Sequence, residues 1–200
     1  MLFGNAPISV VDLATLFQKK FRTLITDSRR TRTRELKRLL RQKGTQLRFD
    51  VFPTHNEPHE HPKREWLLDL VWWDDTPGKK RAVLAVESEW GNTDAILDDF
   101  EKLMSFKAPL KLMVYKTTNH VRQSASIRMK LENYMKEFGH HIRGEKYVLI
   151  EVELRKAVTF YVFRYMTQKH GKIKQLRFRS LFSASQLPKI EGPLTVTLTT

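Results

Sequence analysis

Apolar residues recur along the chain in two different periods, and the two periods alternate. Helical spacing predicts helices over residues 9–26, 28–43, 94–108 and about 124–138. β-Branched and aromatic runs predict strands over 47–52, 65–73, 82–89, 110–116, 146–154 and 158–166. The order strand, helix, strand over 82–116 implies a crossover, and so a parallel pair within a mixed sheet. The expected fold class is α/β in the α+β sense, a central mixed β-sheet flanked by helices.

Local residues set the expected boundaries of these elements. The expected N-caps are Ser9, Thr93 or Asp94, and Ser124 or Ser126. Gly44 is expected at the C′ position of the second helix. Thr76-Pro77-Gly78-Lys79 has Pro and Gly where a type II turn requires them, and predicts a hairpin.

Two glutamates end the strand at 82–89. Side chains alternate along a strand, so Glu87 and Glu89 are expected on one face, roughly 6.6 Å apart. The hairpin can bring Asp69, which lies among large apolar residues, beside them. Crowded carboxylates destabilise a fold unless a cation or a donor compensates. Three carboxylates on adjacent strands suit Mg²⁺ or Mn²⁺, while ion pairs with Lys and Arg are the structural alternative.

A second Glu-x-Glu shows how weak the tripeptide is by itself. Glu151 and Glu153 also stand in an apolar strand, but no Asp occurs after Asp99 and no capped amphipathic helix follows them. Only the copy at Glu87 has both a strand aspartate upstream and such a helix downstream.

The charge indicates a polyanionic partner. Lys and Arg number 36 against 22 Asp and Glu, a formal net charge of +14. Nucleic acid is the commonest partner of so basic a domain. The helix at 28–43 and the basic segment at 169–179 supply the expected phosphate-binding residues: Arg29, Arg30, Arg32, Arg34, Lys37, Arg38, Arg41, Lys172, Lys174 and Arg177. The alternative for this helix is that its basic face is simply exposed to solvent and binds no partner.

Other features exclude whole classes. The chain has no cysteine, which excludes disulfides, thiolate zinc sites and cysteine nucleophiles. It has no apolar run of transmembrane length and no basic start of a signal peptide, so a soluble cytoplasmic protein without a membrane partner is expected. His55, His59 and His61 lie in a proline-rich stretch, where preorganised metal ligation is not expected.

The segment Val86-Glu87-Ser88-Glu89-Trp90-Gly91-Asn92-Thr93-Asp94, followed by Asp98-Asp99-Phe100, resembles the active-site segment of the PD-(D/E)XK nucleases, BamHI-type subgroup. The resemblance covers about 28–117. It implies a restriction endonuclease-like core in which Asp69 and Glu87 bind Mg²⁺ or Mn²⁺ with the Ser88 backbone carbonyl. Glu89 replaces the motif lysine as ligand or base, and Glu35 is the candidate for an added helix acid. Glu65 ranks lower, and Leu68 replaces the motif proline. Lys102 is a weaker candidate for the missing lysine.

The sequence thus predicts one nuclease-like domain over 1–200. Residues 1–27 form an N-terminal helix, 28–117 the catalytic core, and 118–200 a helix and strands that complete or flank the sheet. The expected function is metal-dependent endonucleolytic hydrolysis of DNA, of restriction type by the resemblance, on a double-stranded substrate. Cutting both strands usually takes two active sites, which makes a homodimer a reasonable state. The alternatives are a non-catalytic nucleic-acid-binding protein on the same fold, and a structural or regulatory protein whose acids are ion-paired.

Overall fold

The computed structural model describes residues 7–18, 20, 24–25, 27–52, 67–117, 121–154, 157–166, 172–176 and 181–183. Its helices are α1 (Val10–Gln18), α3 (Arg29–Gln46), α4 (Thr93–Ser105) and α5 (Val121–Glu137). Its strands are β1 (Asp50–Phe52), β2 (Leu70–Asp74), β3 (Arg81–Glu89), β4 (Leu110–Thr117), β5 (Lys146–Glu153), β6 (Ala157–Met166), β7 (Lys172–Leu176) and β8 (Leu181–Ser183).

The strands form one mixed sheet in the order β1 to β7, with β8 beside β6. Pairing is antiparallel from β1 to β3, parallel from β3 to β5, and antiparallel from β5 onward. The two parallel pairs are connected by α4 and α5. The predicted mixed sheet flanked by helices is confirmed, and so is the parallel crossover between β3 and β4.

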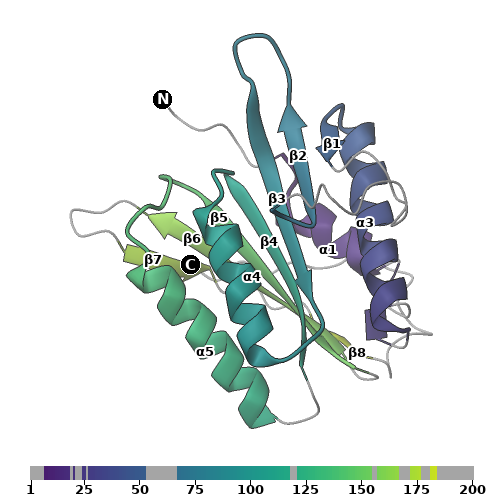
Figure 1. Cartoon of the computed structure of the whole chain (residues 1–200), viewed down its shortest axis with the longest axis vertical. Coiled ribbons are helices and arrows are strands. Elements are labelled where there is room, and N and C mark those ends of the chain that lie inside the picture. Colours follow the sequence, from purple (N-terminus) through teal and green to yellow (C-terminus); the bar gives the residue numbers. More distant parts are fainter. Residues whose placement is uncertain are drawn as a thin grey trace.

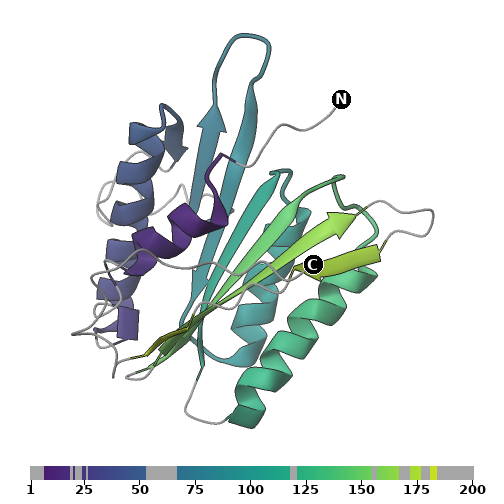
Figure 2. The same ribbon diagram turned by 180° about the vertical axis from the view of Figure 1, so that it is seen from behind.

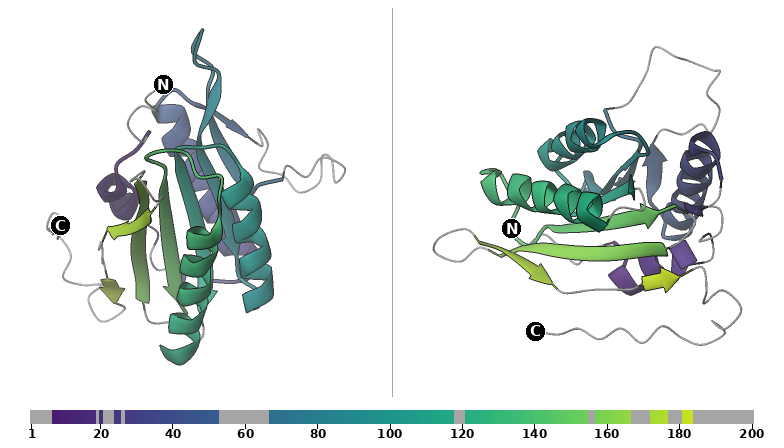
Figure 3. Two further views of the ribbon diagram at one scale, coloured as in Figure 1. Left: turned by 90° about the vertical axis from the view of Figure 1, so that its left-hand side faces the viewer. Right: turned by 90° about the horizontal axis from the view of Figure 1, so that it is seen from below.

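Helices cover both faces of the sheet. α4 and α5 lie on one face (Figure 1), and α1 and α3 lie on the other (Figure 2). Figure 3 shows the layers from the side and from below. Alternate residues of β3 join the two cores: Val86 packs in the cluster with Leu36, and Ala85 in the cluster with Phe100. Because β3 is buried on both faces, it is a rigid support for the carboxylates at its end.

Gly44 is not the end of α3, as was expected, but part of it. The helix runs to Gln46, and the left-handed position is taken by Arg48, with φ 62°. Arg48 N donates to Thr45 O and Phe49 N to Gly44 O, which is a Schellman closure. The glycine is required for another reason: a Cβ at Gly44 would lie 2.7 Å from Trp72 Nε1. The expected strand at 47–52 therefore begins only at Asp50.

We expect Gly44→Ala to destabilise the fold by about 1–3 kcal/mol, because the added methyl group overpacks the contact between α3 and β2. Gly139→Ala is the matched control, since its Cβ would meet no atom within 4 Å and its φ is not positive. Thermal and urea unfolding measure both effects. Equal stability of the two variants would contradict the close approach of α3 to Trp72.

Four other boundaries differ from expectation. The helix expected over 9–26 is α1, which ends at Gln18, and Lys20 lies in a turn. Asn92 caps α4, its side chain accepting from Ala95 N at 2.9 Å, in place of Thr93 or Asp94. α5 begins at Val121, so Ser124 lies inside the helix and donates to Glu151 instead. β2 begins at Leu70, later than the strand expected at 65–73.

The predicted turn at 76–79 is confirmed. Lys79 N donates to Thr76 O at 2.8 Å, and Gly78 has a φ of 79°, as position i+2 of a type II turn requires. None of the helices in the described ranges is long and apolar enough to cross a membrane.

Candidate active site

The β2–β3 hairpin brings Asp69 to the end of β3. Leu70 lies opposite Val86, so Asp69 follows beside Glu87 and Ser88. Asp69 Oδ2 accepts from the Ser88 amide at 2.9 Å and from its hydroxyl at 2.6 Å. The register of the hairpin and these two hydrogen bonds thus hold the Asp69 carboxylate next to Glu87.

Glu87 is the most electrostatically perturbed carboxyl of the site. Its residue is only 5% exposed. Burial, followed by the charges of Asp69 and Asp99, raises the pKa of Glu87 to about 8, while Lys102 opposes the shift. At neutral pH the Glu87 carboxyl group is therefore protonated in most of the molecules. It lies where negative charge is in excess.

Glu89 has its own partners. Its carboxylate forms an ion pair with Arg29 at 3.1 Å and accepts a short hydrogen bond from the Gly91 amide. A Cβ at Gly91 would lie 2.7 Å from Glu89 Oε1, so the glycine allows this approach. The Glu89 carboxylate is therefore held between α3 and the loop that leads to α4.

One face of α3 borders the carboxylates. Lys37 Nζ lies 2.6 Å from Asp69 Oδ1. One turn earlier, Thr33 Oγ1 accepts from Trp90 Nε1 at 2.8 Å, and a further turn earlier Arg29 meets Glu89. Residues four apart share a helix face. That spacing is visible in the sequence, but which face meets β3 is decided by the packing of the leucines.

The basic residues of α3 do not all face solvent. Arg30, Arg34 and Arg38 are exposed, whereas Arg41 is half-buried. Arg32 is only 7% exposed; its guanidinium lies 4.9 Å from the centre of the Trp90 ring and donates to Asp27 O at 2.8 Å. Its burial and its contacts with Trp90 and Asp27 argue against the expected phosphate contact of Arg32.

The basic segment at 169–179 is placed only in part. Lys172 and Lys174 lie on β7, of which the structure gives the backbone alone, and Arg177 lies outside the described residues. Glu65, His55, His59 and His61 also lie outside them.

The structure does not bring Glu35 to the other carboxylates. Glu35 forms ion pairs with Arg38 at 3.0 Å and Lys20 at 3.4 Å. At 3.6 residues per turn it lies about 160° around α3 from Lys37. Asp99 and Lys102 of α4 are the additional charges near Glu87, and they bond to each other at 2.8 Å. The sequence placed Asp99 in the segment that resembles a nuclease active site, but it did not predict that Asp99 lies near Glu87.

The donor set fits a divalent cation in part. Asp69 and Glu87 are neighbouring carboxyl groups, whose oxygen atoms are of the kind that divalent cations prefer. A cation between them would relieve the repulsion that raises the pKa of Glu87. Glu89, however, is engaged by Arg29 and Gly91, and Asp69 by Lys37. Within the described ranges no three Asp, Glu or His side chains are grouped to hold a metal ion. A cation here would use Asp69 and Glu87, with main-chain oxygen or solvent completing its shell.

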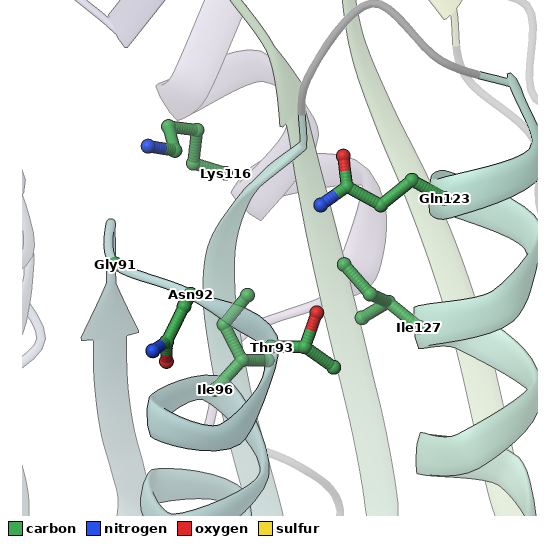
Figure 4. Close-up of a pocket in the computed structure, with 7 residues that line it drawn as sticks. All are labelled: Gly91, Asn92, Thr93, Ile96, Lys116, Gln123 and Ile127. Carbon is green, nitrogen blue, oxygen red and sulfur yellow. The ribbon is translucent and has the colours of Figure 1, made fainter.

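A recess of about 290 Å³ lies beside the site, between the starts of α4 and α5. Figure 4 shows Gln123 and Ile127 projecting from α5 toward Thr93, with Lys116 of β4 above Gly91. Asp69, Glu87 and Glu89 do not line this recess, and it meets the site only through Gly91, whose amide donates to Glu89.

The second Glu-x-Glu has a different environment. Glu151 is buried and accepts from the hydroxyls of Tyr115 at 3.4 Å, Thr117 at 3.2 Å and Ser124. Hydroxyl donors from β4 and α5 satisfy this carboxylate, which agrees with its being the weaker candidate.

In comparisons with known proteins, no family model, no curated protein and no solved structure matches this chain.

Proposed function

We propose that this protein is a metal-dependent endonuclease that hydrolyses DNA phosphodiester bonds. The observation that carries the proposal is the pair of neighbouring carboxyl groups at the end of β3, a partly exposed Asp69 and a buried Glu87 whose pKa is raised to about 8, beside a strongly basic helix. A fold gains no stability from crowded buried carboxylates, whereas a site for a cation and a phosphodiester requires them.

The order of elements supports the same proposal. The resemblance to PD-(D/E)XK nucleases implies a strand with an aspartate, a turn, a strand that ends in Glu-x-Glu, a helix and a further strand, and β2-β3-α4-β4 follow one another in that order. Glu87 and Glu89 stand at the end of β3, and Asp69 lies one residue before β2, which begins at Leu70.

Each residue then has a role in hydrolysis. Asp69, Glu87 and the Ser88 carbonyl would hold Mg²⁺ or Mn²⁺, which polarises the phosphate and lowers the pKa of a bound water. In the reaction, a water oxygen bonds to phosphorus as the bond to the 3′ oxygen breaks. Glu89 accepts the proton of the water, and the 3′ oxygen takes a proton from solvent. A 5′-phosphate and a 3′-hydroxyl remain.

The exposed arginines of α3 provide the surface for the backbone of the nucleic acid. Arg30, Arg34 and Arg38 follow one another at four-residue intervals, and Arg30 lies only about 20° around the helix from Lys37. A strand bound along this row is thereby led to Asp69. Double-stranded DNA is the proposed substrate, and a homodimer is the proposed form for cutting both strands.

We expect the triple variant Arg30→Gln, Arg34→Gln, Arg38→Gln to weaken DNA binding at least tenfold, at about 0.1 M salt. The magnitude of the negative slope of log K against log salt should decrease by about 2–3, because each lost phosphate contact lowers this magnitude by about 0.9. The matched control replaces three exposed lysines elsewhere: Lys107, Lys130 and Lys136, each to Gln. Fluorescence anisotropy over a salt series measures both. Equal losses in the two variants would mean that net charge alone binds DNA.

A non-catalytic DNA-binding protein on the same fold is the second candidate. The Lys37–Asp69 and Arg29–Glu89 ion pairs favour it, because they compensate two of the three carboxylates without a metal ion. The experiment that separates the two incubates plasmid and single-stranded DNA with the protein in Mg²⁺, in Mn²⁺ or with a chelator, beside Asp69→Asn. Metal-dependent cleavage that the variant loses supports the nuclease. Binding without cleavage in every condition supports the alternative.

A further inference from the structure

We infer that Lys37 is a catalytic residue that contacts a non-bridging oxygen of the scissile phosphate, supplied to the site from α3 and not from β3. The inference rests on the proposed nuclease function. It assigns to one α3 lysine a role at the reacting group, distinct from the binding role of the exposed arginines.

The position of Lys37 is fixed from both sides. Its Nζ lies 2.6 Å from Asp69 Oδ1, and Asp69 is itself held by two hydrogen bonds from Ser88. α3 cannot slide along β3, because the Thr33–Trp90 hydrogen bond and the Arg29–Glu89 ion pair fasten the two preceding turns. The ammonium group is thus set next to the carboxylate proposed to bind the cation.

Lys37 also remains accessible to a ligand. Its side chain is 30% exposed, and that of Asp69 is 21% exposed. Ion pairs this open stabilise a fold by about 1 kcal/mol or less. The stability of the fold therefore explains little of why Lys37 lies beside Asp69. Access of Lys37 to an incoming phosphate explains this placement better.

Charge continuity identifies the ligand as a phosphodiester. Lys37 lies three residues after Arg34 on α3, beside the exposed row Arg30, Arg34 and Arg38, and its ammonium group pairs with Asp69. Lys102, whose charge acts on Glu87, is less suited. Its partner at 2.8 Å is Asp99 of the same helix, α4, whereas the partner of Lys37 is Asp69, the carboxylate proposed to bind the cation.

The chemistry requires a cation at this place. As water attacks phosphorus, negative charge grows on the non-bridging oxygens, and a fixed ammonium group stabilises it more in the transition state than in the bound substrate. Lys37 neither gives nor takes a proton in this step. Its effect is on the rate of cleavage of bound DNA, and less on the affinity for DNA.

The test compares Lys37→Met, Lys37→Arg and the control Lys43→Met on the same helix, using the full chain with Mg²⁺. Single-turnover cleavage at saturating DNA gives the rate, anisotropy with the chelator gives Kd, and circular dichroism checks the fold. We expect Lys37→Met to lower the rate at least about 10²-fold while Kd changes less than about fivefold. Lys37→Arg should restore part of the rate, and Lys43→Met should cleave normally.

Two results would overturn the inference separately from the proposed function. If the unaltered chain cleaves and Lys37→Met cleaves within about threefold of it, Lys37 has no role at the phosphate. If Lys37→Met loses only affinity and its rate at saturation is normal, Lys37 is a binding residue. If the unaltered chain cleaves no DNA with any cation, the proposed function itself fails, and the role of Lys37 fails with it.

Discussion

Replacing Glu87 with glutamine is expected to stabilise the folded protein while it abolishes DNA cleavage. Glu87 is buried beside Asp69 and Asp99, and its pKa is raised from 4.5 to about 8. In the unfolded chain at neutral pH the carboxyl is ionised, so folding must take up a proton or bury a charge. Glutamine keeps the shape and removes that cost, which amounts to about 3 kcal/mol at pH 7.

The pH dependence follows from the direction of the shift. Below about pH 4.5 both states are protonated, and Glu87→Gln should change stability little. Between pH 4.5 and about 8 the unfolded state loses a proton that the folded state keeps, so the parent protein loses stability relative to the variant by about 1.4 kcal/mol per pH unit. Above about pH 8 the difference levels off.

Urea unfolding of both proteins from pH 4 to pH 9 measures this difference directly. The activity of Glu87→Gln should fall at least about 10²-fold, because a neutral amide binds the cation more weakly than a carboxylate and does not neutralise the charge of the cation. Glu137→Gln, an exposed change on α5, is the control for both properties. A variant less stable than the parent at pH 7 would show that the Glu87 carboxylate is compensated within the fold.

The second large effect concerns the other end of the sheet, where Glu145→Gln is expected to destabilise the fold by about 3–5 kcal/mol. Lys111 Nζ lies 3.2 Å from Glu145 Oε2, with side chains 2% and 0% exposed. Glu145 also accepts from Tyr147 at 2.7 Å and bonds to His141. Burial alone would raise the pKa of Glu145, but these partners lower it below its usual value.

This buried cluster joins the ends of α4 and α5 to the sheet. Lys111 Nζ donates to Met104 O at 2.7 Å, and His141 Nε2 lies 2.6 Å from Met135 O. Without the carboxylate the ammonium group stays buried and unpaired, and burial already lowers the pKa of Lys111. The substitution should therefore weaken the attachment of both α4 and α5 to the sheet.

Thermal and urea unfolding of Glu145→Gln, with Glu132→Gln as control, test this expectation. Glu132 pairs loosely with Arg128, at 3.8 Å, and its loss should cost less than about 1 kcal/mol. The double variant Lys111→Met, Glu145→Gln should recover part of the loss, since it leaves no unpaired ammonium. Because the pKa of Glu145 is lowered, the gap between parent and variant should close as the pH falls below about 4.5. A single variant as stable as the control would contradict the account.

Much of the fold could be predicted from periodicity because β3, β4 and β5 are buried strands and α4 has a clear apolar stripe. The errors come from tertiary contacts that local patterns do not contain. Gly44 was expected to end a helix, but its missing side chain makes room for Trp72. Arg32 was expected to face phosphates, but it covers Trp90.

The candidate site was predictable in its strands and not in its helices. Hairpin length and the Glu-x-Glu spacing were enough to expect Asp69 beside Glu87. The partners of these acids, Lys37, Arg29 and Asp99, depend on how α3 and α4 are rotated against the sheet. Sequence offers many basic residues in α3, and only packing decides which of them meets a carboxylate. The same rotation turns Glu35 away.

The most direct test of the central claim measures DNA binding and DNA cleavage on the same samples of the parent protein and Glu87→Gln. Plasmid cleavage is followed with Mg²⁺, Mn²⁺ and a chelator, and affinity is measured with the chelator present. We predict cation-dependent cleavage by the parent, and none by a variant that binds DNA equally well. DNA binding by the parent without cleavage under any cation, or cleavage that Glu87→Gln retains, would contradict the assignment of this site as a nuclease centre.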